Sequence, residues 1–268
     1  MKAAAFEYAR PADARGACAL LAAGDGMAKP IAGGQSLGPM LNLRLAQPGQ
    51  LVDLAGVAGL AGARDLGSAV FIGAGVTHAA IEDGRVPDPT HGLLPRVASR
   101  IAYRAVRNRG TVGGSLAHAD PAADWVNLMR LLDATFIIEG PAGSREVASG
   151  DFMQAAFTTA LGESDVLTGM RIAKFSPTAR FGYFKFCRKV GEFAEAIGAV
   201  AIDPARGVRR ALVGATAGAP HLVAHTDAVL AGDTAAIEAE VRAAGCDEPY
   251  EFQLHVVALG RAIAEAMA

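Results

Sequence analysis

Two glycine pairs with hydroxyl side chains beside them are the features of this 268-residue chain most able to do chemistry: Gly33-Gly34 and Gly113-Gly114. Ser36 follows the first pair, and Thr111 and Ser115 flank the second. Glycine lets backbone N–H groups come close to a ligand, and converging N–H groups bind anions. A short helix expected just after the first pair would add its N-terminal amides. The two segments therefore indicate one pyrophosphate held from two sides by amides and hydroxyls.

Other interpretations of these glycines fit less well. Residues 34–38 match G-x-S-x-G, the nucleophile elbow of serine hydrolases, but only one predicted helix and one predicted strand precede them. Gly73 and Gly75 follow a predicted strand, yet His78 stands where the G-x-G-x-x-G dinucleotide motif needs its third glycine. No G-x-x-x-x-G-K-[ST] sequence occurs. The remaining alternative is that the glycine pairs form plain turns without a ligand.

Metal-ligating and catalytic residues are not expected in this chain. His221 and His225 have the i, i+4 spacing of metal ligands, but the segment HLVAH lacks the glutamate of HExxH and a third ligand. We interpret them as surface or loop histidines. His118, within the second glycine segment, could lie near a cofactor without being catalytic. The three cysteines form no CxxC pair, so the chain alone builds neither a zinc knuckle nor an iron–sulfur cluster.

Composition excludes several classes of protein. Apolar residues make up 51% of the chain, and 27 acidic side chains against 25 basic ones give a formal charge of −2. Such a chain has a real core, and it lacks the excess positive charge of a nucleic-acid binder. No apolar run is long enough for a membrane span, so a cytoplasmic protein is expected. Arg96, Arg100 and Arg104 would share one helix face, as a solvated surface or as a docking edge for an acidic partner.

The elements that must position the glycine segments follow from hydrophobic periodicity and from capping residues. Helices are predicted over 11–23, 92–107, from Pro121 onward, 233–244 and 251–267, and Thr77 is a candidate helix cap. Strands are predicted over 29–34, 51–57, 69–75, 134–143, 165–172, 180–189, 195–203 and 208–215. The turn-rich segment 174–179 is the expected domain boundary. Strands followed by two terminal helices suggest a small α+β domain after it.

The order AGGQSL, LVDL, IGAGVTH, VRNRGTVGGSLAHADPAAD, RKVGEFAEAIGAV resembles the FAD-binding medium subunit of molybdenum hydroxylases, the family of CO dehydrogenase and of the xanthine dehydrogenase flavin domain. The resemblance covers nearly the whole chain. It implies an α+β fold: a two-part vanillyl-alcohol-type (PCMH-type) FAD-binding domain over 1–175 and a small α/β C-terminal domain over 176–268.

The resemblance also implies the FAD-binding residues. Amides of the first segment and the Ser36 hydroxyl would hold the pyrophosphate, and residues 110–115 would form the opposing loop. Asp124 would hold the adenosine end, and Lys185 would lie near the isoalloxazine, where its charge favours the anionic reduced flavin. The full set is Lys29, Pro30, Ile31, Ala32, Gly33, Gly34, Gln35, Ser36, Leu37, Ile101, Gly110, Thr111, Gly113, Gly114, Ser115, Asp124, Leu167 and Lys185.

Two positions depart from some relatives. Gln35 stands where certain members have His, which a backbone-donor role tolerates, and Phe193 stands where certain members carry Tyr beside the ring. The hydrogen bond of that tyrosine is then lost.

The implied function is electron transfer within an oxidoreductase. In such complexes a large subunit holds the molybdenum cofactor, a small subunit holds two [2Fe–2S] clusters, and FAD in the medium subunit passes electrons to an external acceptor. The resemblance implies a dimer of heterotrimers. Two alternatives stay open: a stand-alone vanillyl-alcohol-type oxidase, for which the segment after the boundary is short, and a docking subunit that has lost FAD.

Overall fold

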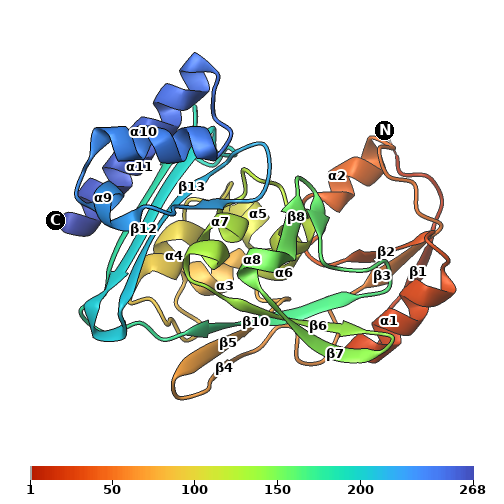
Figure 1. The fold of residues 1–268 in the computed structure, drawn as a ribbon. Coiled ribbons are helices and arrows are strands. Elements are labelled where there is room, and N and C mark those ends of the chain that lie inside the picture. The colour runs from red at the N-terminus through yellow and green to blue at the C-terminus, as the bar shows by residue number, and fades with distance from the viewer. Residues whose placement is uncertain (1) are drawn as a thin grey trace.

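The computed structural model describes residues 2–268, arranged as three larger sheets and one two-stranded sheet, with helices packed between and outside them (Figure 1). A small parallel sheet has the order β1-β3-β2, and α1 packs beside it. Asp13 caps α1 by accepting from the Gly16 amide, so the helix predicted over 11–23 begins only at Ala14; it ends at Ala23 as predicted, with Gly24 as its C-cap. The elements of this part are β1 (Glu7–Ala9), α1 (Ala14–Ala23), β2 (Ala28–Ile31), α2 (Leu37–Asn42) and β3 (Gln50–Asp53).

A five-stranded antiparallel sheet of order β4-β5-β10-β6-β7 follows. Alternate residues of β6 are buried, because one face of this sheet packs on helices and the other faces outward. The strands are β4 (Ala63–Asp65), β5 (Ala69–Gly73), β6 (Thr135–Gly140), β7 (Gly143–Ala148) and β10 (Val166–Ala173). A small hairpin joins β8 (Met153–Ala155) to β9 (Thr158–Thr159).

Short helices fill the space between this sheet and the C-terminal one (Figure 1). They are α3 (His78–Glu82), α4 (Leu93–Ala98), α5 (Arg104–Arg107), α6 (Val112–His118), α7 (Asp124–Leu131) and α8 (Ser149–Phe152). Thr77 caps α3, as predicted, by accepting from the Ala80 amide. Trp125 of α7 is fully buried in the main core that these helices share with the sheet.

The C-terminal part is an antiparallel sheet of order β11-β12-β13-β14 covered by three helices. Every residue of β12 is buried, because α11 packs on one face of the sheet and α7 on the other. The elements are β11 (Arg180–Phe186), β12 (Ala196–Asp203), a 3₁₀ turn (Pro204–Arg206), β13 (Val208–Gly214), β14 (His221–Leu222), α9 (Thr226–Leu230), α10 (Thr234–Ala243) and α11 (Pro249–Met267).

The segment 174–179 connects the two larger sheets and is anchored to the second. Asp203 accepts from both the amide and the hydroxyl of Ser176, at 2.7 and 2.6 Å. The mixed α+β architecture agrees with the predicted fold class. The division into 1–175 and 176–268 stays a prediction.

The predicted helix over 92–107 is wrong, because it is two short helices separated at residues 99–103. Ala102 has a left-handed φ of 45°, and the Arg107 guanidinium donates to the carbonyls of Ile101 and Ala102. The three arginines therefore do not share a face. Arg96 pairs with Glu265, and Arg104 pairs with Glu82 and Asp83, so these two are engaged within the chain.

Smaller boundaries also differ. The helix expected from Pro121 begins at Asp124, because the Asp120 carboxylate first accepts from the Ala122 amide in a turn. The sequence does not predict β4 and β7, which pair at the two edges of the five-stranded sheet, nor the short strands β1, β8, β9 and β14. Within the described residues, no helix is both long and apolar enough to cross a membrane.

Candidate functional site

The first glycine segment forms a loop, residues 32–36, between β2 and α2; we call it the donor loop. Gly34 adopts a left-handed φ of 69°, which favours glycine. Among residues 2–268, no oxygen accepts a hydrogen bond from the backbone N–H of any of the five loop residues. The loop is half-buried to exposed. It therefore presents consecutive free amide donors to a ligand.

The second glycine segment, residues 110–115, uses its amides differently; we call it the packing loop. The N–H groups of Val112 and Gly113 donate to the carbonyls of Val76 and Ala74, at 3.0 and 2.9 Å. Those of Gly114 and Ser115 donate to the hydroxyl and carbonyl of Thr111. Thr111 is thus the cap of α6, and its hydroxyl proton remains available to a ligand. This loop offers side-chain hydroxyls rather than a row of amides.

The two loops touch. A Cβ at Gly33 would overlap the Arg109 carbonyl and lie 2.8 Å from the Gly110 Cα. A Cβ at Gly114 would lie 3.9 Å from the Cβ of Ala32. The structure therefore brings together the two segments that the sequence analysis pairs, and Gly33 is required because a backbone runs against it.

A buried histidine lies beneath the packing loop. The His78 backbone N–H donates to the Gly110 carbonyl at 2.9 Å, and a Cβ at Gly110 would lie 2.8 Å from His78 Nε2. Trp125 Nε1 donates to His78 Nδ1 at 3.0 Å, so the neutral ring carries its proton on Nε2. Burial, together with the nearby Arg107 charge, lowers the pKa of His78 to about 4. In the sequence, His78 is distinguished only by standing where a dinucleotide motif needs its third glycine.

Asp124 and Lys185 form a buried ion pair of 2.8 Å that joins α7 to β11. Tyr183 donates its hydroxyl to the other carboxylate oxygen at 3.0 Å. Burial raises the pKa of Asp124, against the opposing effects of Lys185 and Tyr183. Burial and the Asp124 charge raise the pKa of Tyr183 well above its usual range. This cluster ties the N-terminal helices to the C-terminal sheet.

The comparisons with known proteins decide the family. Residues 4–174 match the family described as the FAD binding domain in molybdopterin dehydrogenase. The chain belongs to this family. It is therefore an FAD-binding oxidoreductase subunit of the molybdenum hydroxylase kind.

Its relatives are subunits of dehydrogenases and hydroxylases. The chain is 38% identical over 191 residues to the carbon monoxide dehydrogenase medium chain of Hydrogenophaga pseudoflava, covering 71% of this chain and 67% of the relative. It is 36% identical over 205 residues to the nicotine 6-hydroxylase medium subunit of Paenarthrobacter nicotinovorans, covering 76% and 71%.

Solved structures agree over the whole chain. The structure of carbon monoxide dehydrogenase from Hydrogenophaga pseudoflava matches with a TM-score of 0.91 and 32% identity, covering 100% of this chain and 99% of the other. Quinoline 2-oxidoreductase from Pseudomonas putida 86 matches with a TM-score of 0.87 and 32% identity, covering 99% and 98%.

The predicted FAD residues of this family member fall into distinct places. Residues 29–37 and 110–115 are adjacent, as described above. Ile101 is half-buried and pairs with Gly191 in an isolated bridge. Leu167 is buried within the main core. Their contact with FAD stays a prediction.

The structure adds a relation between two of the predicted residues. The resemblance implies that Asp124 lies at the adenosine end of FAD and Lys185 near the isoalloxazine, and the two side chains are bonded to each other. Their contact with FAD stays a prediction. The Asp124 carboxylate also offsets the Lys185 charge that was expected to favour the anionic reduced flavin.

Two clusters of polar side chains lie elsewhere in the chain, and in both the side chains that could bind a metal already have other partners. His221 and His225 both bond the buried Glu240 carboxylate, at 2.8 Å each. Burial alone would raise the pKa of Glu240, but these bonds and the His225 amide lower it to about 2. Both histidines thus have a structural partner, which the sequence does not reveal.

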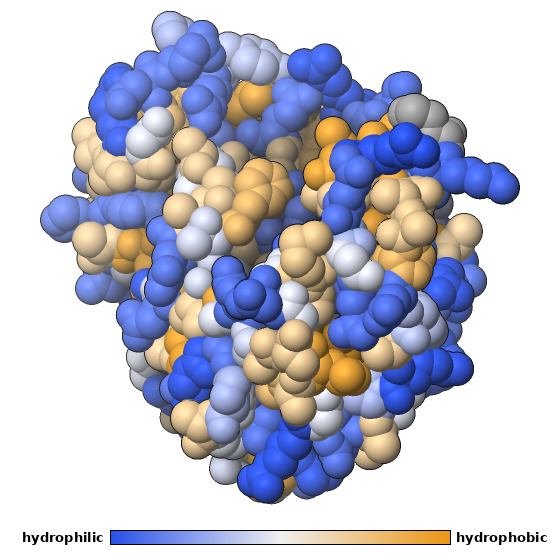
Figure 2. Space-filling view, turned by 90° about the vertical axis from the view of Figure 1, so that its right-hand side faces the viewer, coloured by the Kyte–Doolittle hydropathy of each residue, from blue (hydrophilic) through white to orange (hydrophobic). Residues whose placement is uncertain are grey.

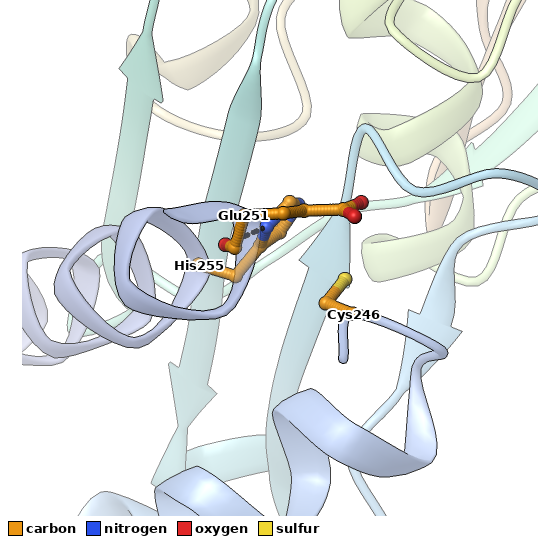
Figure 3. Close-up of side chains that lie close together, drawn as sticks. All are labelled: Cys246, Glu251 and His255. Atoms are coloured by element: carbon orange, nitrogen blue, oxygen red, sulfur yellow. Dashed lines mark hydrogen bonds between the residues drawn. The ribbon is translucent and has the colours of Figure 1, made fainter. Parts of the chain in front are cut away.

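The second cluster joins Cys246, Glu251 and His255, whose ligand atoms lie within 4.8 Å of one another (Figure 3). However, both ring nitrogens of His255 face carbonyl oxygens, of Glu251 at 2.8 Å and of Gly214 at 3.1 Å. Burial, helped by the Glu251 charge, raises the pKa of Cys246 to about 12. A protonated thiol and an imidazole whose two ring nitrogens both face backbone carbonyl oxygens are poor metal ligands.

Proposed function

We propose that the chain is the FAD-carrying electron-transfer subunit of a heteromeric molybdenum-containing hydroxylase or dehydrogenase. It would receive electrons from [2Fe–2S] clusters of a small partner subunit and pass them to an external acceptor. The single observation that carries this proposal is the row of free amides in the donor loop, placed against the packing loop in a chain of this family.

The residues present fit the FAD pyrophosphate. The donor loop supplies up to five N–H groups, of Ala32 to Ser36, with no competing acceptor among residues 2–268. The Ser36 hydroxyl makes no cap bond to α2, so it is free to donate. Thr111 adds a hydroxyl from the other loop. Bound FAD would supply reversible uptake of one or two electrons, which no side chain of this family member provides.

The flavin-ring end is best assigned to the junction of residues 101–103 with residues 190–193. Gly191, at a φ of 92°, packs on the Ala102 carbonyl, and a Cβ there would lie 2.7 Å from that oxygen. Tyr103 and Phe193 are 65% and 60% exposed beside this junction. Exposed aromatic side chains next to a bound ring would exclude water from it.

Partner subunits are expected to cover part of the N-terminal surface. Apolar side chains form several patches among charged ones on the face shown in Figure 2. Met27, Leu43 and Leu45 are 58%, 56% and 73% exposed. Exposed large apolar side chains are typical of protein interfaces, which supports a multi-subunit assembly. The relatives' names, medium chain and medium subunit, lead us to expect a small and a large partner subunit. A dimer of heterotrimers is what the resemblance to the family implies.

The test is to express the chain together with its genomic neighbours and purify the assembly. We expect one FAD per chain, with iron and molybdenum on co-purifying subunits, measured by released flavin and metal analysis. FAD on a solitary chain that oxidises an alcohol or amine would contradict the proposal in favour of an oxidase. An assembly without FAD would contradict it in favour of a docking subunit.

A further inference from the structure

A small cavity lies away from the glycine loops, between α7, α8 and the segment before β14. Its volume is about 70 Å³, and its walls include Phe136, Phe152 and Pro220. A cavity of this volume is larger than a single water molecule needs and has room for a small polyatomic ion. Pro220 comes from the C-terminal part and the other two from the N-terminal part, so a ligand here would touch both.

Two polar groups of this cavity have no partner. Ser149 is 7% exposed, and its hydroxyl has no hydrogen-bond partner among the described residues. The half-buried Arg130 lines the same cavity and takes part in no ion pair or side-chain hydrogen bond within residues 2–268. An unmet hydroxyl and an uncompensated guanidinium are each unfavourable when withdrawn from water.

The Arg130 guanidinium is held in place against α8. A Cβ at Gly150 would lie 2.6 Å from Arg130 Nη1 and 3.1 Å from its Cζ, so the charged group packs directly on the Gly150 backbone. Ser149 is the preceding residue in the chain, and it lines the same cavity as Arg130. The glycine therefore lets the guanidinium pack against the segment that carries the unpartnered hydroxyl.

Arginines of neighbouring elements behave differently. Arg210 pairs with Asp133, Arg145 with Asp165, and Arg171 with Glu146. Arg130 stands out among them because it lacks a carboxylate. Aromatic and apolar walls around a cation lower the local dielectric, so a matching anion would be bound more strongly there than at the surface.

We propose that this cavity is a binding site for a small oxyanion of the phosphate class. Arg130 would donate to it in the bidentate manner that guanidinium groups favour, and Ser149 would donate its hydroxyl. Bound in this cavity, the anion would contact α7 and α8 of the N-terminal part and the segment of the C-terminal part that carries Pro220. Its effect would be to stabilise the docking of the two parts of the chain. This proposal does not rest on the function proposed above.

The test is thermal unfolding and calorimetric titration of the FAD-saturated protein with inorganic phosphate. Saturation with FAD removes the pyrophosphate site as a competing place for phosphate. Sodium chloride of equal ionic strength and pH is the reference. We expect the unfolding midpoint to rise with phosphate concentration beyond the chloride reference, with one phosphate bound per chain.

Variants distinguish phosphate binding in this cavity from phosphate binding at other cationic surfaces. Arg130→Gln should weaken phosphate binding at least about tenfold, because a charge-assisted bidentate contact is lost. Ser149→Ala should weaken it less and serves if Arg130→Gln fails to fold. Arg209→Gln is the matched control, because Arg209 is an exposed residue of β13 that pairs with Asp227, and this variant should bind phosphate like the unaltered chain. Equal responses in all variants, or no response beyond chloride, would overturn the proposal.

Discussion

The donor loop and the packing loop have similar composition but opposite uses of the backbone. In the donor loop, glycine leaves N–H groups free and lets residue 33 lie against another backbone. In the packing loop, the amides of residues 112–115 are already bonded within the chain. Gly110 and Gly113 serve there to make room for His78 and Ala74. A glycine pair therefore indicates ligand binding only where the fold leaves its amides without partners.

Gly33→Ala should give the largest effect. The new Cβ would overlap the Arg109 carbonyl and push the loops apart, so the dissociation constant of FAD should rise about 100-fold, from about 3 kcal/mol of overpacking. Flavin fluorescence titration measures it. Gly38→Ala is the matched control, because no atom lies within 4 Å of the added Cβ and FAD binding should be unchanged. Similar FAD affinity in both variants would contradict the contact between the loops.

Changes beneath the packing loop should instead alter the stability of the chain and its dependence on pH. His78 has a pKa of about 4 in the folded chain, below its ordinary value of 6.5, so the unfolded chain binds the extra proton between these values. Stability is therefore complete above pH 6.5 and is lost as the pH falls toward 4, by about 3 kcal/mol in all. Urea unfolding between pH 4 and 7 measures this loss. In His78→Gln the loss over that range should be smaller by this amount; an identical pH profile would contradict the buried neutral imidazole.

Gly113→Ala should show that the packing loop affects stability more than FAD binding. Its Cβ would overlap Ala74, so the free energy of unfolding should fall by about 2 kcal/mol through overpacking. The fraction that remains folded should bind FAD within a few-fold of the unaltered chain. Thermal unfolding and flavin titration on the same sample measure both. A large loss of FAD affinity without loss of stability would reverse the roles given to the loops.

The hydroxyls should give the smallest effects. Ser36→Ala removes one donor and no cap bond, so FAD should bind about five-fold more weakly at unchanged stability. Thr111→Val removes a hydroxyl that also caps α6, so it should in addition cost about 1 kcal/mol of stability. Equal stability of the two variants would contradict the assignment of the Thr111 hydroxyl, but not the Ser36 hydroxyl, as a helix cap.

Local features of the fold could be predicted from the sequence because short-range physics determines them. Thr77 as a cap of α3, the end of α1 at Ala23, and the strands around the glycines follow from patterns within a few residues. The break at residues 99–103 could not be predicted, since it depends on the Arg107 guanidinium taking two carbonyls and on Gly191 packing from far along the chain.

The candidate site shows the same limit. The two glycine segments and their pairing could be predicted, but not which amides stay free, because the acceptors of residues 112 and 113 lie on Val76 and Ala74. The ion pair of Asp124 with Lys185 joins residues 61 positions apart, and no local pattern indicates it. Sequence reasoning thus identifies the residues of this site more readily than their bonds.

The most direct test of the account is amide hydrogen exchange of the chain with and without FAD, resolved by residue. Free N–H groups exchange quickly and bonded ones slowly. We predict fast exchange at residues 33–36 without FAD and strong protection with it, while the amides of residues 112–115 are protected in both states. Bound FAD with no added protection at residues 33–36, or with new protection confined to residues 112–115, would contradict it.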